Sequence, residues 1–170
     1  MLACLALGGC QALEPRAASQ PAVPQAGNAE LIACIADQPL VTAEAAYRAT
    51  YLLSKGEAFS GDFAALTEAL RAEALVGKSW QYTSDQFVDR AAIGFMVCRA
   101  CNIRSGVNWN LTGLGRYAWR ELQYHRIADE GSEYGLMSGG EFVGLLSRAE
   151  DYLRRTAKGG EGVELGAPPK

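Results

Sequence analysis

The chain has one histidine, no excess charge of one sign and no long apolar run, and each shortage excludes a class of function. With one histidine and no second cysteine pair, a four-ligand zinc site lacks partners, and we expect no metal or cofactor. A net charge of −3 leaves no basic face predicted for nucleic acid. No run approaches the ~20 apolar residues of a membrane-spanning helix. The 49% apolar content still predicts a globular domain.

The most informative motif is Leu7-Gly8-Gly9-Cys10. A short apolar run, two small residues and a cysteine resemble the lipobox of bacterial lipoproteins. The resemblance implies that residues 1–9 are a signal peptide, that cleavage leaves Cys10 as the new N-terminus, and that its thiol carries palmitate or a similar lipid. A secretory signal also has a basic first region. No Lys or Arg precedes Cys10, so we expect the natural start to lie upstream.

The residues that follow predict a tether and then one domain. Residues 10–28 contain three prolines and almost nothing to bury, which predicts a flexible linker. Residues 29–158 suit a single domain with its own core, and residues 159–170 are predicted to be a disordered tail. This organisation places the domain in the cell envelope, lipid-anchored to a bacterial membrane and facing the periplasm or exterior.

Apolar spacing predicts an all-α fold: a single domain of about five amphipathic helices, with degenerate helical-hairpin repeats as one option. The clearest start is Ser138-Gly139-Gly140-Glu141, a capping box in which the serine hydroxyl and the glutamate carboxylate each satisfy a free backbone N–H. The expected helices are Ala29–Ala36, Thr42–Ser54, Asp62–Gly77, Ser84 (or Thr83) to Asn102, Thr112–Ala128 and Ser138–Lys158. Residues 103–112 are predicted to be a loop.

Three segments repeat one pattern, a hydroxyl cap followed by an apolar residue: Leu40–Ala46, Thr83–Val88 and Met137–Val143. Spacings of about 42 and 54 residues lie in the range of repeated helical units. Together with the helices expected around Tyr117–Leu122 and Ser138–Leu153, the pattern resembles S-layer homology modules. That resemblance spans residues 39–155 and implies binding of cell-wall polysaccharide. The Arg of the family's Thr-Arg-Ala-Glu motif is missing after Thr42 and after Ser138.

Cys98 and Cys101 form the one motif with catalytic associations, because a dithiol at this spacing serves redox chemistry or metal binding. Their expected place near a helix C-terminus opposes this, since the helix dipole there disfavours a thiolate. Small core residues are the simpler interpretation. Cys4 and Cys10 are assigned to export and anchoring, so three cysteines remain for the folded domain: Cys34, Cys98 and Cys101. An odd number of cysteines does not predict a fold held together by disulfides.

Two further sets are candidates for function. His125 has Glu121 one turn before it, a usable pair for a general base, although no nucleophile is tied to it by a motif.

Aromatic residues beside amides form surfaces on which sugars and proteins dock. The predicted partner-binding set is Trp80, Trp109, Tyr117 and Trp119, with Asn108 and Asn110 beside Trp109. Core packing is the competing interpretation.

No assembled catalytic set is recognisable, so the sequence predicts a non-enzyme. The leading hypothesis is a lipid-anchored envelope protein whose helical domain binds a wall glycan or an envelope protein. The alternative is a periplasmic thiol-redox or metal-binding protein that uses Cys98 and Cys101.

Overall fold

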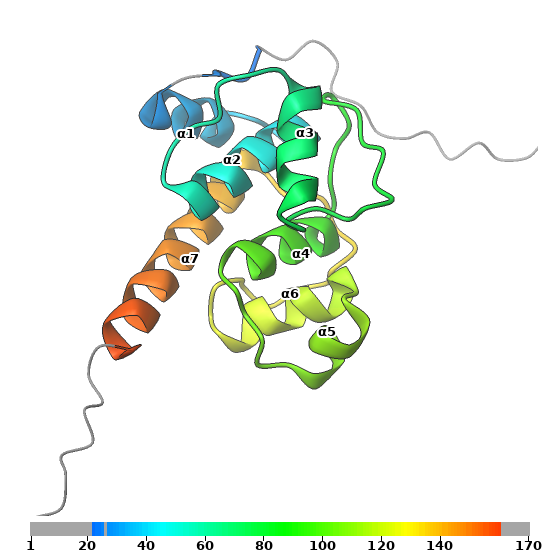
Figure 1. The fold of residues 1–170 in the computed structure, drawn as a ribbon, viewed down its shortest axis with the longest axis vertical. Coiled ribbons are helices and arrows are strands. Elements are labelled where there is room, and N and C mark those ends of the chain that lie inside the picture. Colours follow the sequence, from blue (N-terminus) through cyan, green and yellow to red (C-terminus); the bar gives the residue numbers. More distant parts are fainter. Residues whose placement is uncertain (1–21, 26, 161–170) are drawn as a thin grey trace, which may run out of the picture.

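The computed structural model describes residues 22–25 and 27–160, and the regular secondary structure in that part of the chain is all helical (Figure 1). Its helices are α1 Asn28–Ala36, α2 Ala43–Lys55, α3 Phe63–Ala72, α4 Arg90–Ala100, α5 Val107–Thr112, α6 Gly115–Tyr124 and α7 Gly139–Gly160. The all-α class is confirmed, with seven helices in the described residues instead of about five. None of these helices combines the length and the apolar character needed to span a bilayer. Cys10 and the predicted signal, and most of the predicted tail, lie outside the described residues.

Side-chain caps open four of the helices. Thr42, Asp62, Asp89 and Ser138 each accept a hydrogen bond from the backbone N–H three residues later, at 2.7 to 3.3 Å. Such caps satisfy donors that the first helical turn leaves free. At its other end, α2 stops at Gly56, whose φ of 78° lies in the left-handed region that glycine tolerates. The bounds predicted for α2 are therefore confirmed.

Three of these capped starts meet at the centre of the molecule. The caps Thr42, Asp89 and Ser138 open α2, α4 and α7. In each case the backbone N–H just after the cap donates to a carbonyl just before the cap of the next helix, so the three bonds form a closed cycle. The bonds are Ala43 to Gln86 (2.8 Å), Arg90 to Gly135 (2.9 Å) and Gly139 to Gln38 (2.9 Å).

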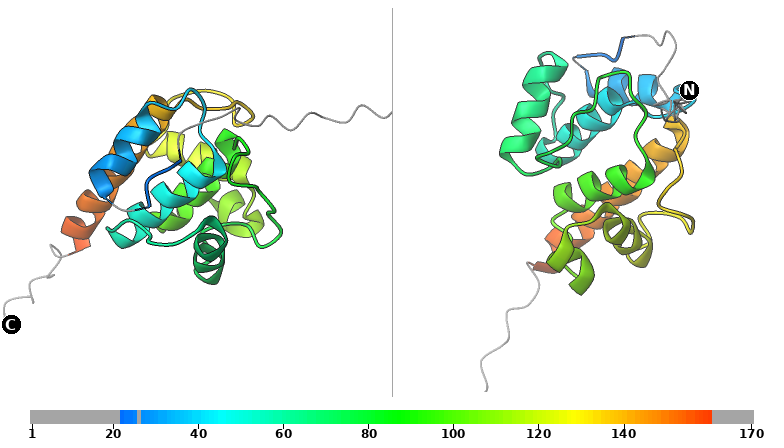
Figure 2. Two further views of the ribbon diagram at one scale, coloured as in Figure 1. Left: turned by 90° about the horizontal axis from the view of Figure 1, so that it is seen from above. Right: turned by 90° about the vertical axis from the view of Figure 1, so that its right-hand side faces the viewer.

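The helices follow the same cyclic order. In the chain, α1, α3 and α6 each precede one of the capped helices, but within the described residues only α1 packs substantially on the capped helix that follows it. Each of the three preceding helices packs on the capped helix of another pair: α3 on α2, α6 on α4 and α1 on α7 (Figure 2). The residues just before the caps, Val41, Val88 and Met137, are each 1% exposed and fill the centre. The three sequential helix pairs thus close into one unit around a shared core.

The predicted helix from Ser84 to Asn102 begins instead at Arg90. Its first residues form extended contacts, including isolated bridges from Phe87 to Thr42 and from Asp89 to Leu136. The cap of this helix is therefore Asp89, and the caps Thr42, Asp89 and Ser138 lie 47 and 49 positions apart. In this register an arginine, Arg90, does follow one cap.

Other boundaries also differ from the prediction. α3 ends at Ala72, before Gly77, and the segment predicted as a loop contains α5. α6 begins at Gly115 after Leu114, which supplies no side-chain cap.

Candidate functional site

An aromatic cluster joins the loop before α4 to α4 and α5. Ring centroids are 5.6 Å apart for Trp80 and Tyr82, 5.2 Å for Trp80 and Phe95, and 5.5 Å for Phe95 and Trp109. The Arg99 guanidinium lies over this row, 5.3 Å from the Phe95 ring and 5.1 Å from the Trp109 ring. Edge-to-face rings and an overlying cation reinforce one another, so the row is a fixed platform.

The four aromatic residues selected from the sequence lie in three separate parts of the structure. Trp80 and Trp109 belong to the aromatic cluster through Phe95. Trp119 is 2% exposed, and its indole N–H donates to the Gly131 carbonyl at 3.3 Å, so it is a core residue. Tyr117 lies on α6 with the Arg116 and Arg120 guanidinium groups over its ring, at 4.8 and 6.0 Å. No single surface unites all four.

An open pocket of about 270 Å³ adjoins the outer end of the aromatic cluster. Its lining is Trp80, Gln81, Tyr82 and Gln86, two aromatic rings and two amides with no formal charge. Ring faces offer apolar contact, and the amides offer donors and acceptors, although Gln86 Oε1 already accepts from the Thr83 N–H at 3.3 Å. This combination suits a neutral ligand that has both C–H faces and hydroxyl groups.

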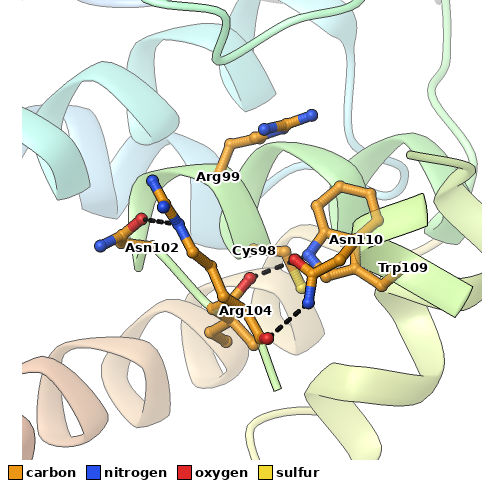
Figure 3. Close-up of a pocket in the computed structure, with 7 residues that line it drawn as sticks. Cys98, Arg99, Asn102, Arg104, Trp109 and Asn110 are labelled. Carbon is orange, nitrogen blue, oxygen red and sulfur yellow. Dashed lines mark hydrogen bonds between the residues drawn. The ribbon is translucent and has the colours of Figure 1, made fainter. Parts of the chain in front are cut away.

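A second pocket, beside Trp109 at the other end of the cluster, holds about 60 Å³ (Figure 3). Its polar rim is already bonded internally: Arg104 Nε donates to Asn102 Oδ1 at 2.9 Å, and the Asn110 amide donates to the Arg104 carbonyl. The Trp109 indole N–H donates to the Ile103 carbonyl at 2.9 Å. A volume of this size holds a few water molecules, so the pocket has no room for a sugar.

Cys98 and Cys101 lie at the C-terminal end of α4, 1% and 5% exposed, and both are free thiols. Burial raises the pKa of the Cys98 thiol well above its usual range and that of Cys101 to about 12. The Cys98 thiol donates to the Ala118 carbonyl at 3.3 Å. Among the described residues no three His, Cys, Asp or Glu side chains gather as a metal site. These surroundings disfavour the thiolate on which redox and metal chemistry depend.

His125 and Glu121 meet through Ser105, a contact not expected from the sequence. The Ser105 hydroxyl oxygen lies 2.6 Å from Glu121 Oε2 and 2.7 Å from His125 Nε2. A hydroxyl has one proton, so when Ser105 donates to the carboxylate, His125 Nε2 must act as the donor to the serine. In a nucleophilic triad the acid orients the histidine through its other nitrogen and the histidine accepts from the serine. The arrangement therefore ties a loop to α6 more readily than it activates a nucleophile.

Several residues of these sites carry no local sequence signal. Phe95 and Arg99 are ordinary members of an apolar helix, and Gln81 and Gln86 lie in a polar loop. Ser105 meets His125 across 20 positions, a contact that only the packing of α6 creates. No family model, curated protein or solved structure matches the chain.

Proposed function

We propose that this chain is a non-catalytic, lipid-anchored protein of the bacterial cell envelope whose helical domain binds wall glycan. The observation that carries the binding role is the uncharged pocket formed by Trp80, Tyr82 and the two glutamines. The lipobox ending at Cys10 and the proline-containing linker after it support the envelope location. Palmitate at Cys10 would hold the protein at a bilayer.

Glycan is the favoured ligand because each group of the pocket has a counterpart on a sugar. The C–H face of a pyranose stacks on an indole or phenol ring, and its hydroxyls pair with amides. The volume of about 270 Å³ is near the lower limit for small-ligand pockets, which suits one ring of a longer chain. The pocket is open, so neighbouring sugars can extend past it.

The test is co-sedimentation of the full chain with purified wall polysaccharide. Replacing Gln81 and Gln86 by Ala removes the amides from exposed or half-buried positions without disturbing the core, and we expect loss of most binding. Trp80→Ala should remove it too. The matched control is Tyr134→Ala, an aromatic residue 71% exposed and outside the pocket, which should bind as the parent does. Undiminished binding by the Gln81→Ala/Gln86→Ala protein would contradict the proposed site, whereas absence of binding by the parent would contradict the function.

Anchoring is tested separately. Metabolic labelling with a palmitate analogue should mark the natural protein and spare Cys10→Ser. Equal labelling of both proteins would remove Cys10 as the attachment site.

The thiol-redox or metal-binding alternative at Cys98 and Cys101 finds less support, because both thiols are buried and their pKa values are raised. Thiol titration of the folded protein distinguishes the two hypotheses. Rapid reaction of both cysteines before denaturation would favour the alternative.

A further inference from the structure

The stretch from Arg99 to Arg126 has a net positive charge, whereas the rest of the chain has a net negative charge. It contains five of the 16 basic residues and, in Glu121, one of the 19 acidic residues. Its net charge is therefore +4, while the rest of the chain carries −7. A local excess of this sign within an acidic protein indicates an anionic partner for that region.

The same stretch also displays most of the exposed apolar side chains. Of five large apolar or aromatic residues exposed in the described part of the chain, only Tyr134 lies outside it. The four within it are Val107 (78% exposed), Leu111 (81%), Leu114 (45%) and Tyr124 (77%). Scattered exposed apolar residues are ordinary, but Val107 and Leu111 on α5 and Leu114 at the start of α6 are close together in the chain, and such a group indicates an interaction surface.

The fold keeps the side chains of Val107, Leu111 and Leu114 exposed. Trp109 on α5 is 3% exposed and hydrogen-bonded to the Ile103 carbonyl, so it fastens the helix to the body of the molecule. Val107 and Leu111, one turn apart on the same helix, are both exposed, and α5 lies at the edge of the molecule (Figure 1). Leu114 follows Gly113, whose left-handed φ of 62° ends α5. The three aliphatic residues therefore form a fixed outer edge.

Four arginines accompany this edge. Arg99 lies over the Trp109 ring, Arg104 is beside α5 in the preceding loop, and Arg116 and Arg120 flank Tyr117 on α6. All four are exposed. The salt bridges seen in the described residues at Arg48, Lys55, Arg71, Arg90, Arg148 and Arg154 do not involve these four arginines. Their exposed guanidinium groups can meet an external anion.

We propose that the outer edge of α5 and these four arginines form a membrane-contact face for an anionic phospholipid bilayer. Val107, Leu111 and Leu114 would enter the boundary between headgroups and acyl chains, while the guanidinium groups pair with lipid phosphates. Exposed aliphatic side chains with exposed arginines in the same stretch of chain match a surface that is apolar below and anionic above. The contact is separate from the glycan pocket and needs no acyl chain on Cys10.

The test is flotation of the full Cys10→Ser chain with vesicles of phosphatidylcholine, alone or mixed with phosphatidylglycerol. We expect binding only to the anionic vesicles, weakened by salt. Val107→Ser/Leu111→Ser should lower the affinity at least tenfold. Arg116→Ala/Arg120→Ala should lower it about fivefold per arginine. All four positions are exposed, so circular dichroism should show an unchanged fold.

Matched controls are Tyr134→Ser for exposed apolar area and Arg154→Ala/Arg155→Ala for charge, both outside the face, and both should bind as the parent does. The proposal is overturned by absence of binding to anionic vesicles, or by equal binding of the Val107→Ser/Leu111→Ser protein. It is also overturned if that variant binds vesicles normally but loses binding to an envelope protein, because the face would then dock a protein.

Discussion

Arg90 and Glu141 join the first turns of α4 and α7: Arg90 Nη2 donates to Glu141 Oε1 at 2.8 Å across 51 positions of sequence. The Arg90 guanidinium also lies over the Trp119 ring, 5.9 Å from its centroid. The predicted capping box is therefore half formed. Ser138 accepts from the Glu141 N–H, but the Glu141 carboxylate pairs with α4 instead of turning back to its own helix.

This pair should contribute measurable coupling. We expect a double-mutant cycle of Arg90→Ala and Glu141→Ala to give about 0.5–1 kcal/mol in the free energy of unfolding, because both side chains are partly exposed and screened. Urea unfolding of the four proteins measures it, and added salt should reduce it. Strictly additive losses would mean that the contact does not stabilise the fold.

Gly139 should tolerate no side chain. A Cβ there would lie 1.7 Å from the Ile35 carbonyl oxygen, which belongs to the backbone and cannot turn away. We expect Gly139→Ala to lower the free energy of unfolding by about 2 kcal/mol or more. Gly140→Ala is the control, because its Cβ would come no nearer than 3.9 Å to a neighbour. Alanine there should stabilise α7 by about 0.5–1 kcal/mol, and equal effects at the two positions would contradict the close approach.

Arg48 should be the most sensitive charged position. Its side chain is 1% exposed, pairs with Glu44 at 2.8 Å, and donates to the Phe59 and Gly61 carbonyls at 3.1 and 3.0 Å. Arg48→Ala leaves these acceptors without partners, and we expect a loss of about 3 kcal/mol or more. Arg48→Lys should restore little, because an ammonium cannot span three separate acceptors.

Denaturant unfolding measures the Arg48 effect, with exposed Arg155→Ala as the control expected to be near zero. If Arg48→Ala lowers the free energy of unfolding by less than about 1 kcal/mol, the prediction is wrong, and water satisfies the carbonyls that the guanidinium had bonded.

Alkaline pH should destabilise the domain through its buried thiols. In the unfolded chain cysteine ionises near pH ~8.5. The folded-state pKa values are raised, that of Cys101 to about 12, so the folded state keeps protons that the unfolded state releases. The two thiols therefore contribute fully to stability below pH ~8.5, and this contribution is lost as the pH rises toward their folded-state pKa values.

Urea unfolding between pH ~8 and ~11 should show this decline, and Cys98→Ala/Cys101→Ala should make it shallower. Tyr47, whose pKa burial also raises, leaves a residual slope in both proteins. Identical slopes for parent and variant would contradict the thiol assignment.

Features that depend on neighbouring residues were predictable from the sequence. Thr42 and Gly56 bound α2, and the Ser138 hydroxyl opens α7, because caps act within three or four residues. The start of α4 was not predictable in this way. Thr83 and Ser84 have cap-like side chains, but the segment up to Asp89 pairs with Thr42 and Leu136, so tertiary contacts delay the helix.

The candidate sites depend still more on long-range packing. Sequence reasoning selected Trp80 and Trp109, yet only Phe95 on α4 connects them. It paired His125 with Glu121 by helical spacing, whereas the two are linked by Ser105, which lies on a loop. A hydroxyl in a Gly/Ser/Asn segment gives no sign of such a partner, because that segment's position is fixed only when α5 and α6 pack together.

The closed cycle of hydrogen bonds through Ala43, Arg90 and Gly139 joins the starts of α2, α4 and α7 to one another in a ring. An open solenoid gains or loses repeats at its ends and adjusts its length. Here α1 packs on α7, so the first and last helices of the described residues already cover each other and leave no open end on which a further helical unit could stack.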